Sequence, residues 1–344
     1  MTVTLRDVAA RAGVSLQTVS NVANGRSARV GEDTRAKVLA AIAALQYRPN
    51  VAARRLREMP TGVLALAIII PDLSNPYFAE VSKVIIVEAA ARGYTALLDY
   101  TNWDREQELL VARGMRPQLI DGLILDVQRL TVADLTASPP RLPIVLIGER
   151  IYDGPYDHVV IDNVAAARLA TEHLIALGRR RIAVIGRQEH PTSNAPRMRL
   201  QGYLDALAAA GRAADPCLQA SASRWSHASG AAAMRALLAL PQPPDAVFCF
   251  SDVLGIGAIS VLHQTGCRIP DDVAVVGFDD VDDAQFTVPP LTSIEPDKAA
   301  IGRLAVDLLT QRITGARAGP PQRFDQAFGL VIRQSTVGRT PGGH

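Results

Sequence analysis

The sequence predicts an N-terminal all-α head joined by a hinge to an α/β body of two doubly wound parallel-sheet lobes. Three observations predict this fold. Short helical patterns fill residues 1–49, an Arg-rich stretch bounded by prolines follows at 50–61, and strand patterns alternate with helical ones from about residue 63. The chain has 344 residues. Since one domain usually has roughly 100–200 residues, several domains are expected.

The head shows the pattern of a helix-turn-helix domain. Thr4 opens a capping box that ends at Asp7, Gly13 provides a turn, and Ser15 is a suitable N-cap for a second helix. Helices this short are stable only when their apolar faces pack together. The positions at helical spacing are Leu5, Val8, Ala9 and Ala12 in the first helix and Val38, Ala41, Ile42 and Leu45 in the third.

The body alternates buried strands and helices. Its longest apolar run, "VLALAIII" from Val63 to Ile70, is far shorter than the about 20 residues of a membrane span and predicts a buried strand. Eight or more such strands fit two lobes better than one, with a ligand cleft at the carboxyl ends of the strands. The lobes are expected at residues 62–160 plus 293–322 and residues 161–292 plus 323–344.

Charge separates the head from the body. Residues 1–60 carry ten lysines and arginines against four acidic residues, a net charge of +6, whereas the whole chain carries +2. A basic head on a mildly acidic body indicates a polyanionic partner for the head, although a merely soluble basic segment is the alternative on charge alone.

Composition argues against an enzyme and against a metal site. The three cysteines are scattered and the six histidines lack a metal-ligand spacing, so no cofactor or metal is expected. Gly255 and Gly257 faintly resemble a dinucleotide fingerprint, but Ser260 stands where its third glycine would be. The N-terminus lacks the apolar region of a signal peptide, so we expect a cytoplasmic protein.

The second helix of the head has two contrasting faces. At 100° per residue, Val19, Val22 and Ala23 fall on an inner face and Leu16 at its rim. The outer face carries amides and hydroxyls, which suit adenine in the major groove, while an apolar side chain suits a thymine methyl group. A solvated polar face is the alternative. The outer residues are Gln17, Ser20, Asn21 and Asn24.

The stretch "TLRDVAARAGVSLQTVSNVANG", with "TRAKVLAAIAALQYRPNVAARRLR" after it, resembles the head of the lactose-repressor/galactose-repressor family of bacterial transcription regulators. The match runs from Thr4 to Arg57, and the body resembles periplasmic sugar-binding proteins. The resemblance implies a cytoplasmic, nucleoid-associated homodimer that binds a pseudo-palindromic operator as a repressor, with a small-molecule effector between the lobes. Whether the effector weakens or strengthens DNA binding stays open.

The resemblance also assigns DNA contacts. It implies base reading by Leu16, Gln17 and Asn21, and Asn21 departs from the Arg that is common there, which shifts the expected preference from guanine to adenine. In the linker, Leu56 is the implied minor-groove wedge. The implied contacts to phosphates and nearby groups are Thr4, Ser15, Thr18, Ser20, Asn24, Arg54 and Arg55.

The body supplies the implied effector contacts. A ring for stacking, an arginine and several carboxylates favour a sugar or polyol, and a purine-type co-repressor or a sugar-handling enzyme is the alternative. For Tyr77 and Phe78 a core position is the competing interpretation, for Asp126 a loop cap, and for Arg199 a surface ion pair. The candidates are Asn75, Tyr77, Phe78, Asp126, Arg199, Trp225, Asp252 and Asp279.

Overall fold

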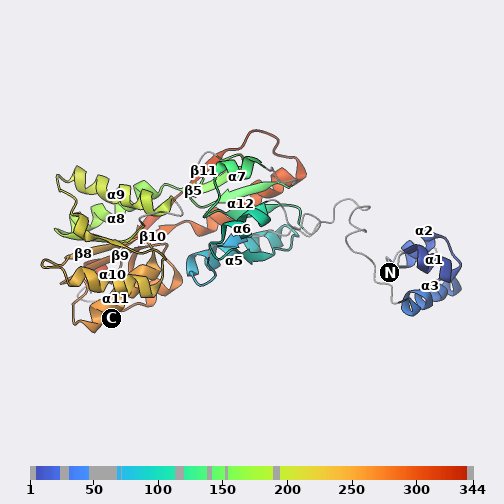
Figure 1. Ribbon diagram of the computed structural model, residues 1–344, viewed down its shortest axis with the longest axis horizontal. Helices are drawn as coiled ribbons and strands as arrows, with labels where there is room; N and C mark the ends of the chain where they lie inside the picture. Colours follow the sequence, from blue (N-terminus) through green and yellow to red (C-terminus); the bar gives the residue numbers. More distant parts are fainter. Residues whose placement is uncertain are drawn as a thin grey trace. The chain divides into compact units, whose positions relative to one another are not determined.

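The computed structural model describes residues 5–23, 31–45, 68–70, 72–112, 120–137, 142–151, 154–188 and 194–338 (Figure 1). Internal contacts divide the chain into a unit of residues 1–62 and a unit of residues 63–344. The predicted linker at 50–61 lies outside the described residues. So do five predicted DNA contacts: Thr4, Asn24, Arg54, Arg55 and Leu56.

The head consists of three short helices, as predicted. They are α1 (Leu5–Ala12), α2 (Leu16–Ala23) and α3 (Glu32–Ala44). One buried valine from each helix, Val8, Val19 and Val38, meets in a small shared core. Each helix alone is too short to be stable, so this shared core is what keeps them folded.

The body contains two six-stranded sheets. The strand order of the first sheet is β11-β5-β4-β3-β1-β2, and all its pairs are parallel. Its strands are β1 (Ile68–Ile70), β2 (Leu98–Tyr100), β3 (Leu123–Asp126), β4 (Ile144–Ile147), β5 (Asp157–Ile161) and β11 (Arg323–Gln326). The central strands β3, β4 and β5 are completely buried, as expected of strands covered on both faces.

The second sheet has the order β12-β10-β9-β8-β6-β7 and is parallel except for the pair β10 and β12. Its strands are β6 (Ile182–Arg187), β7 (Gln219–Ser221), β8 (Ala246–Cys249), β9 (Ala274–Phe278), β10 (Thr292–Pro296) and β12 (Phe328–Val331). The doubly wound, two-lobed α/β fold predicted for the body is therefore confirmed.

Helices cover both faces of each sheet. In the first lobe these are α5 (Pro76–Ala91), α6 (Arg105–Ala112), α7 (Val132–Ala137) and α12 (Lys298–Thr314). In the second lobe, α8 and α9 lie on one side of the sheet and α10 and α11 on the other (Figure 1). The second-lobe elements are α8 (Asn163–Ala176), α9 (Ala195–Ala209), α10 (His227–Leu238), α11 (Asp252–Gln264), α13 (Gln334–Val337) and the 3₁₀ turns η2 (Pro216–Leu218) and η3 (Asp282–Phe286).

The chain passes between the lobes at positions that differ from the expected 293 and 323. Strand β10 pairs with β9, so residues up to Pro296 belong to the second sheet. Strand β11 pairs with β5, so Arg323 to Gln326 belong to the first sheet. The hydrogen-bond ladders decide these boundaries, and the short sequences "TSIEP" and "RFDQ" lack the long apolar run that would have marked a strand.

Within the described part of the chain, no helix is long and apolar enough to cross a bilayer. The same residues contain no group of three or more His, Cys, Asp or Glu side chains that could hold a metal ion.

Close helix packing in the second lobe depends on a glycine. A Cβ atom added at Gly202 in α9 would lie 2.2 Å from the carbonyl oxygen of Val164 and 2.8 Å from the backbone nitrogen of Arg168, both in α8. These are fixed backbone atoms, so only a residue without Cβ allows this approach.

We therefore expect Gly202→Ala to destabilise the body by about 1–3 kcal/mol through overpacking, measured by urea denaturation. Helix propensity alone would stabilise this variant by about 1 kcal/mol, so the sign of the change separates the two effects. The neighbouring Gln201 is exposed, and Gln201→Ala should change the free energy of unfolding by less than about 0.5 kcal/mol. Equal stability of both variants would refute the packing argument.

Candidate functional site

Helix α2 presents an apolar inner face and a more open outer side. Val19 is completely buried and Val22 nearly so, whereas Leu16 is 36% exposed. Ser15 caps the helix, since its Oγ accepts a hydrogen bond of 3.1 Å from the backbone nitrogen of Thr18. The inner face and the cap were both expected from the sequence.

The structure describes the predicted base-reading positions unequally. Leu16 is exposed at the first turn of α2, and Asn21 is half-buried one turn further on. The backbones of Gln17 and Ser20 belong to α2, while their side chains lie outside the described set. Thr18 is half-buried, with its Oγ1 2.9 Å from the Oγ of Ser15.

A cavity in the body brings together seven of the eight predicted effector residues. The cavity has about 60 Å³ of space for the centres of water molecules. The seven are Asn75, Tyr77, Phe78, Asp126, Arg199, Trp225 and Asp279. Sequence reasoning missed the other lining residues, which are Asp72, Trp103, Gln128, Gly148, Glu149, Gln188, Ala195 and Pro196.

The fold explains why these residues meet. Asp126 ends β3, Glu149 follows β4, and Asp279 follows β9, so the carboxyl ends of strands from both sheets face the cavity. Glu149 follows "PIVLIG" just as Asp126 closes "DGLILD". The rule that polar residues at strand ends face the cleft would therefore have identified Glu149 from the sequence.

Residues at the start of α5 form one wall. The Oδ1 atom of Asn75 accepts a hydrogen bond of 3.1 Å from the backbone nitrogen of Tyr77, so Asn75 caps the helix. The rings of Tyr77 and Phe78 contact each other edge to face, with centroids 5.4 Å apart. Burial, followed by nearby carboxylates such as Glu149, raises the pKa of Tyr77 well above its usual value, so its hydroxyl keeps its proton.

Arg199 is fixed from several sides. Its Nε donates to Oδ1 of Asn163 over 2.7 Å, and its Nη1 donates to the carbonyl oxygen of Phe250. The guanidinium carbon lies 3.3 Å from the ring centroid of Phe278, and the group is 3.8 Å from the carboxylate of Asp279. Arg199 is only 5% exposed, so the alternative of a surface ion pair is wrong.

Three buried carboxyl groups line the cavity together with this guanidinium. Burial raises the pKa values of Asp126 and Glu149. Burial also raises the pKa of Asp279 to about 6, although Arg199 and the hydroxyl of Ser251 oppose the shift. The cavity wall is therefore rich in hydrogen-bond acceptors and has one cationic group that is already partnered.

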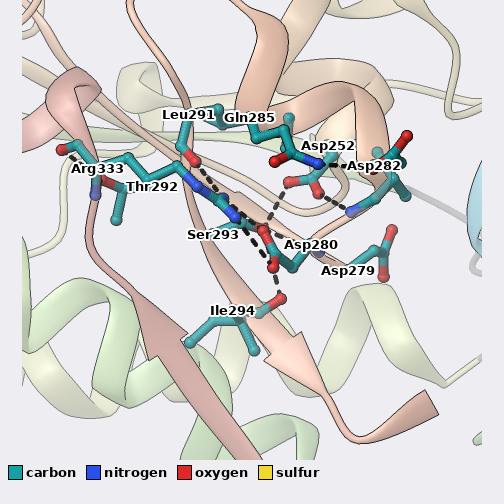
Figure 2. A network of polar contacts seen from close by, with 12 residues as sticks. Asp252, Asp279, Asp280, Asp282, Gln285, Leu291, Thr292, Ser293, Ile294 and Arg333 are labelled. Carbon is teal, nitrogen blue, oxygen red and sulfur yellow. Dashed lines mark hydrogen bonds and ion pairs between the residues drawn. The ribbon is translucent and has the colours of Figure 1, made fainter. Parts of the chain in front are cut away.

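Asp252 is the exception among the predicted effector residues, because it does not line the cavity. It is completely buried at the start of α11. Its carboxylate accepts hydrogen bonds from the backbone nitrogen of Val281 over 2.9 Å and from Oγ of Ser293 over 2.6 Å (Figure 2). The prediction of a ligand contact is corrected here: Asp252 braces the loop behind the cavity wall.

The braced loop has an unusual backbone. Asp279 has φ +111° and Asp280 has φ +44°, which are uncommon conformations for residues other than glycine. Figure 2 shows the side chain of Arg333 reaching the carboxylate of Asp280, and a carbonyl oxygen of Leu291 accepts from the same guanidinium over 2.8 Å. The surroundings thus hold the loop in a strained form that aims Asp279 at the cavity.

The same loop is bonded to elements of the first lobe. Lys298, at the start of α12, donates from Nζ to the carbonyl oxygens of Asp279 over 2.8 Å and Asp280 over 2.7 Å. Lys298 also pairs with Glu80 of α5 over 2.7 Å. Glu80 in turn accepts from the backbone nitrogen of Asp282 over 2.9 Å. A residue of the cavity wall is therefore connected to a polar bridge between the lobes.

Comparisons with known proteins agree with this arrangement. Residues 4–50 match the family described as bacterial regulatory proteins, lacI family, and residues 171–336 match a periplasmic binding protein-like domain. The HTH-type transcriptional repressor CytR of Escherichia coli K12 is 35% identical over 335 residues, which are 97% of this chain and 96% of CytR.

Solved structures of transcription regulators are also similar to this chain. A transcriptional regulator CelR–cellobiose complex is 34% identical with a TM-score of 0.70, covering 97% of this chain and 99% of that one. The Lac repressor dimer bound to operator and the anti-inducer ONPF is 28% identical with a TM-score of 0.74, covering 98% and 99%. These relatives are transcription regulators, so the alternative of a sugar-handling enzyme is not supported.

One buried histidine next to the cavity gives a pH prediction. Nε2 of His158 is hydrogen-bonded to the carbonyl oxygen of Gly148, and burial lowers the pKa of His158 to about 4. The unfolded chain binds this proton near the ordinary value of about 6.5, so the contribution of His158 to stability is lost as pH falls from 6.5 towards 4. NMR titration should show one histidine with a midpoint near pH 4.

Substitution identifies this titration. His158→Gln should abolish the low-pH midpoint and reduce the loss of stability between pH 6.5 and pH 4. His227→Gln, at an exposed histidine, should leave both unchanged. A midpoint for His158 near that of an unfolded histidine would contradict the burial argument.

Proposed function

Because the chain belongs to the lacI family of bacterial regulatory proteins, we propose that it is a homodimeric transcription repressor whose affinity for a pseudo-palindromic operator is set by an uncharged, sugar-like effector bound in the cavity. The observation that carries the effector class is the cavity wall, where carboxyl groups outnumber cationic groups and aromatic rings stand beside them. The proposed place of action is the cytoplasm, on the nucleoid.

Charge argues against an anionic effector. A phosphate or carboxylate would face Asp126, Glu149 and Asp279, while the guanidinium of Arg199 is already engaged by Asn163 and Phe250. Burying an unpaired charge is costly, so such a ligand would bind poorly. An uncharged molecule with several hydroxyl groups can donate further hydrogen bonds to these carboxyl oxygens, because a carboxylate accepts more than one. The CelR structure, which contains cellobiose, supports this class.

Ring stacking is the second requirement. The indole of Trp225 lines the cavity, and the guanidinium carbon of Arg199 lies 5.2 Å from its ring centroid. A pyranose or furanose face suits such an indole, because its C–H groups form an apolar surface. The same rings would also stack on a purine. The effector screen must therefore distinguish a purine co-repressor from a sugar.

In the head, we propose base reading by Leu16, Gln17 and Asn21, and phosphate or nearby contacts from the other predicted positions. The exposure of Leu16 beside the buried Val19 supports docking of α2 by one face and reading by the other. The linker residues Arg54, Arg55 and Leu56 keep the roles that the family resemblance implies.

Effector binding would act through the polar bridge of Glu80, Lys298 and Asp282, because the bridge is bonded to the loop that carries Asp279. A ligand that contacts Asp279 changes the balance between two lobe arrangements only if it binds one of them better. This coupling is reciprocal, so operator binding must also change effector affinity.

A thermal-shift screen tests the effector class. We expect one of cellobiose, ribose or glucose, at 100 times its Kd, to raise the unfolding midpoint by roughly 5 °C, and glucose 6-phosphate to have no effect. Trp225→Ala should abolish the shift, whereas Phe286→Ala, which removes a 72% exposed ring outside the cavity, should retain it. A shift with adenine or guanine and none with the sugars would replace the sugar by a purine co-repressor.

The second test addresses base reading. Asn21→Arg should move the preferred base at one operator position from adenine towards guanine, by about 1–3 kcal/mol of discrimination, measured by selection from randomised half-sites. Ala40→Arg places the same charge on an exposed position of α3 and should strengthen binding without altering the preferred base. An unchanged preference in Asn21→Arg would remove this residue from the base-reading set.

A further inference from the structure

Trp103 has a hydrogen-bond donor without an acceptor among the described residues. Its Nε1 atom is buried, and no hydrogen-bond acceptor is found for it among the residues described. The residue follows β2 and lines the same cavity as Trp225, although it comes from the first lobe. Buried polar groups are nearly always hydrogen-bonded in folded proteins, so an orphaned indole N–H in a ligand cavity needs an explanation.

The backbone at this point is strained as well. Asn102 has φ +50° and Trp103 has φ +62°, so two successive residues other than glycine occupy the left-handed region. Residues held in such conformations cluster at ligand sites, where the surrounding structure maintains them. This left-handed turn carries Trp103 at the cavity wall.

Several contacts hold this turn in position. The backbone nitrogen of Asp104 donates to the carbonyl oxygen of Thr101 over 2.9 Å, which closes the turn. Nε of Arg129 donates to the carbonyl oxygen of Trp103 over 3.2 Å. Nη2 of Arg224 lies 3.5 Å from Oδ1 of Asn102 and adds a contact from the other lobe. The indole is therefore positioned before any ligand arrives.

The two tryptophans of the chain differ in what they offer. Nε1 of Trp225 donates to the carbonyl oxygen of Gly186 over 3.1 Å, so its N–H is used and only the ring face is available. Trp103 has the opposite arrangement, because its N–H has no acceptor among the described residues. One indole is thus suited to stacking and the other to donating a hydrogen bond.

We propose that Trp103 is a specificity-determining residue that donates a hydrogen bond from Nε1 to a hydroxyl oxygen of the effector. This inference rests on the proposed function, since it assigns one further contact in the same cavity. The acceptor is a neutral oxygen, because Asp126, Glu149 and Asp279 disfavour a carboxylate or phosphate there. A neutral oxygen ligand relieves the orphaned donor without burying a further negative charge.

The first experiment follows both indole N–H groups directly. Full-length protein labelled with ¹⁵N-tryptophan gives two indole resonances, which Trp103→Phe and Trp225→Phe assign. Cellobiose, ribose and glucose are then added separately. With a sugar that raises the unfolding midpoint, we expect the Trp103 N–H resonance to move downfield and its exchange with solvent to slow. The Trp225 N–H, already bonded to Gly186, should keep its slow exchange.

The second experiment measures affinity by calorimetry. Trp103→Phe keeps an aromatic ring and removes the donor, so its affinity for the sugar should fall about 5- to 100-fold. Monodeoxy analogues of that sugar then locate the acceptor: for the analogue that lacks it, the native protein and Trp103→Phe should bind with equal affinity. The unfolding midpoint of Trp103→Phe without sugar reports separately on folding.

The outcomes are distinguishable. A sugar that stabilises the native protein but leaves the Trp103 resonance unmoved, with equal affinity in Trp103→Phe, overturns this inference and leaves the proposed function intact. A uniform loss of affinity in Trp103→Phe for the sugar and for all its deoxy analogues also overturns it, because the indole then acts by shape alone. If none of the three sugars stabilises the protein, the proposed effector class fails and this inference fails with it.

Discussion

The arrangement of the body depends on the buried pairing of Arg199 with the cavity wall. A guanidinium that is 5% exposed is costly to bury unless its donors are used. Here Asn163 and the carbonyl oxygen of Phe250 accept from it, the ring of Phe278 lies against its face, and Asp279 balances its charge. These partners come from α8, the end of β8 and the end of β9, so one side chain ties three elements together at the carboxyl edge of the second sheet.

Asp279 connects this pairing to the rest of the molecule. Its side chain faces the cavity, while its carbonyl oxygen accepts from Lys298, which pairs with Glu80 of the first lobe. Its left-handed backbone is maintained from behind by Asp252, which accepts from the loop and from Ser293. Asp252 does not line the cavity, but it holds the loop from which the side chain of Asp279 faces the cavity. Asp252 and Asp279 both follow a strand of the second sheet, yet one supports the loop and the other lines the cavity.

Much of the fold followed from the sequence because its signals are local. The apolar runs of β3, β4, β6, β8 and β9 predicted buried parallel strands, and seven cavity residues were predicted from strand ends and family resemblance. Short strands without such runs were missed. Strands β10 and β11 are partly polar, and β12 is only four residues long. Their assignment to a sheet depends on which distant strand they pair with.

By itself the sequence determined the helix-turn-helix head, its charge, the alternating body and the family, since helical periodicity, capping residues and apolar runs are properties of neighbouring positions. Tertiary structure alone decided where the chain changes lobe, that Asp252 supports the wall from behind, and that Trp103 and Trp225 meet in one cavity with opposite hydrogen-bonding states. The physical reason is that these features depend on contacts between residues far apart in the chain. Whether a buried donor finds an acceptor is fixed only when those residues pack together.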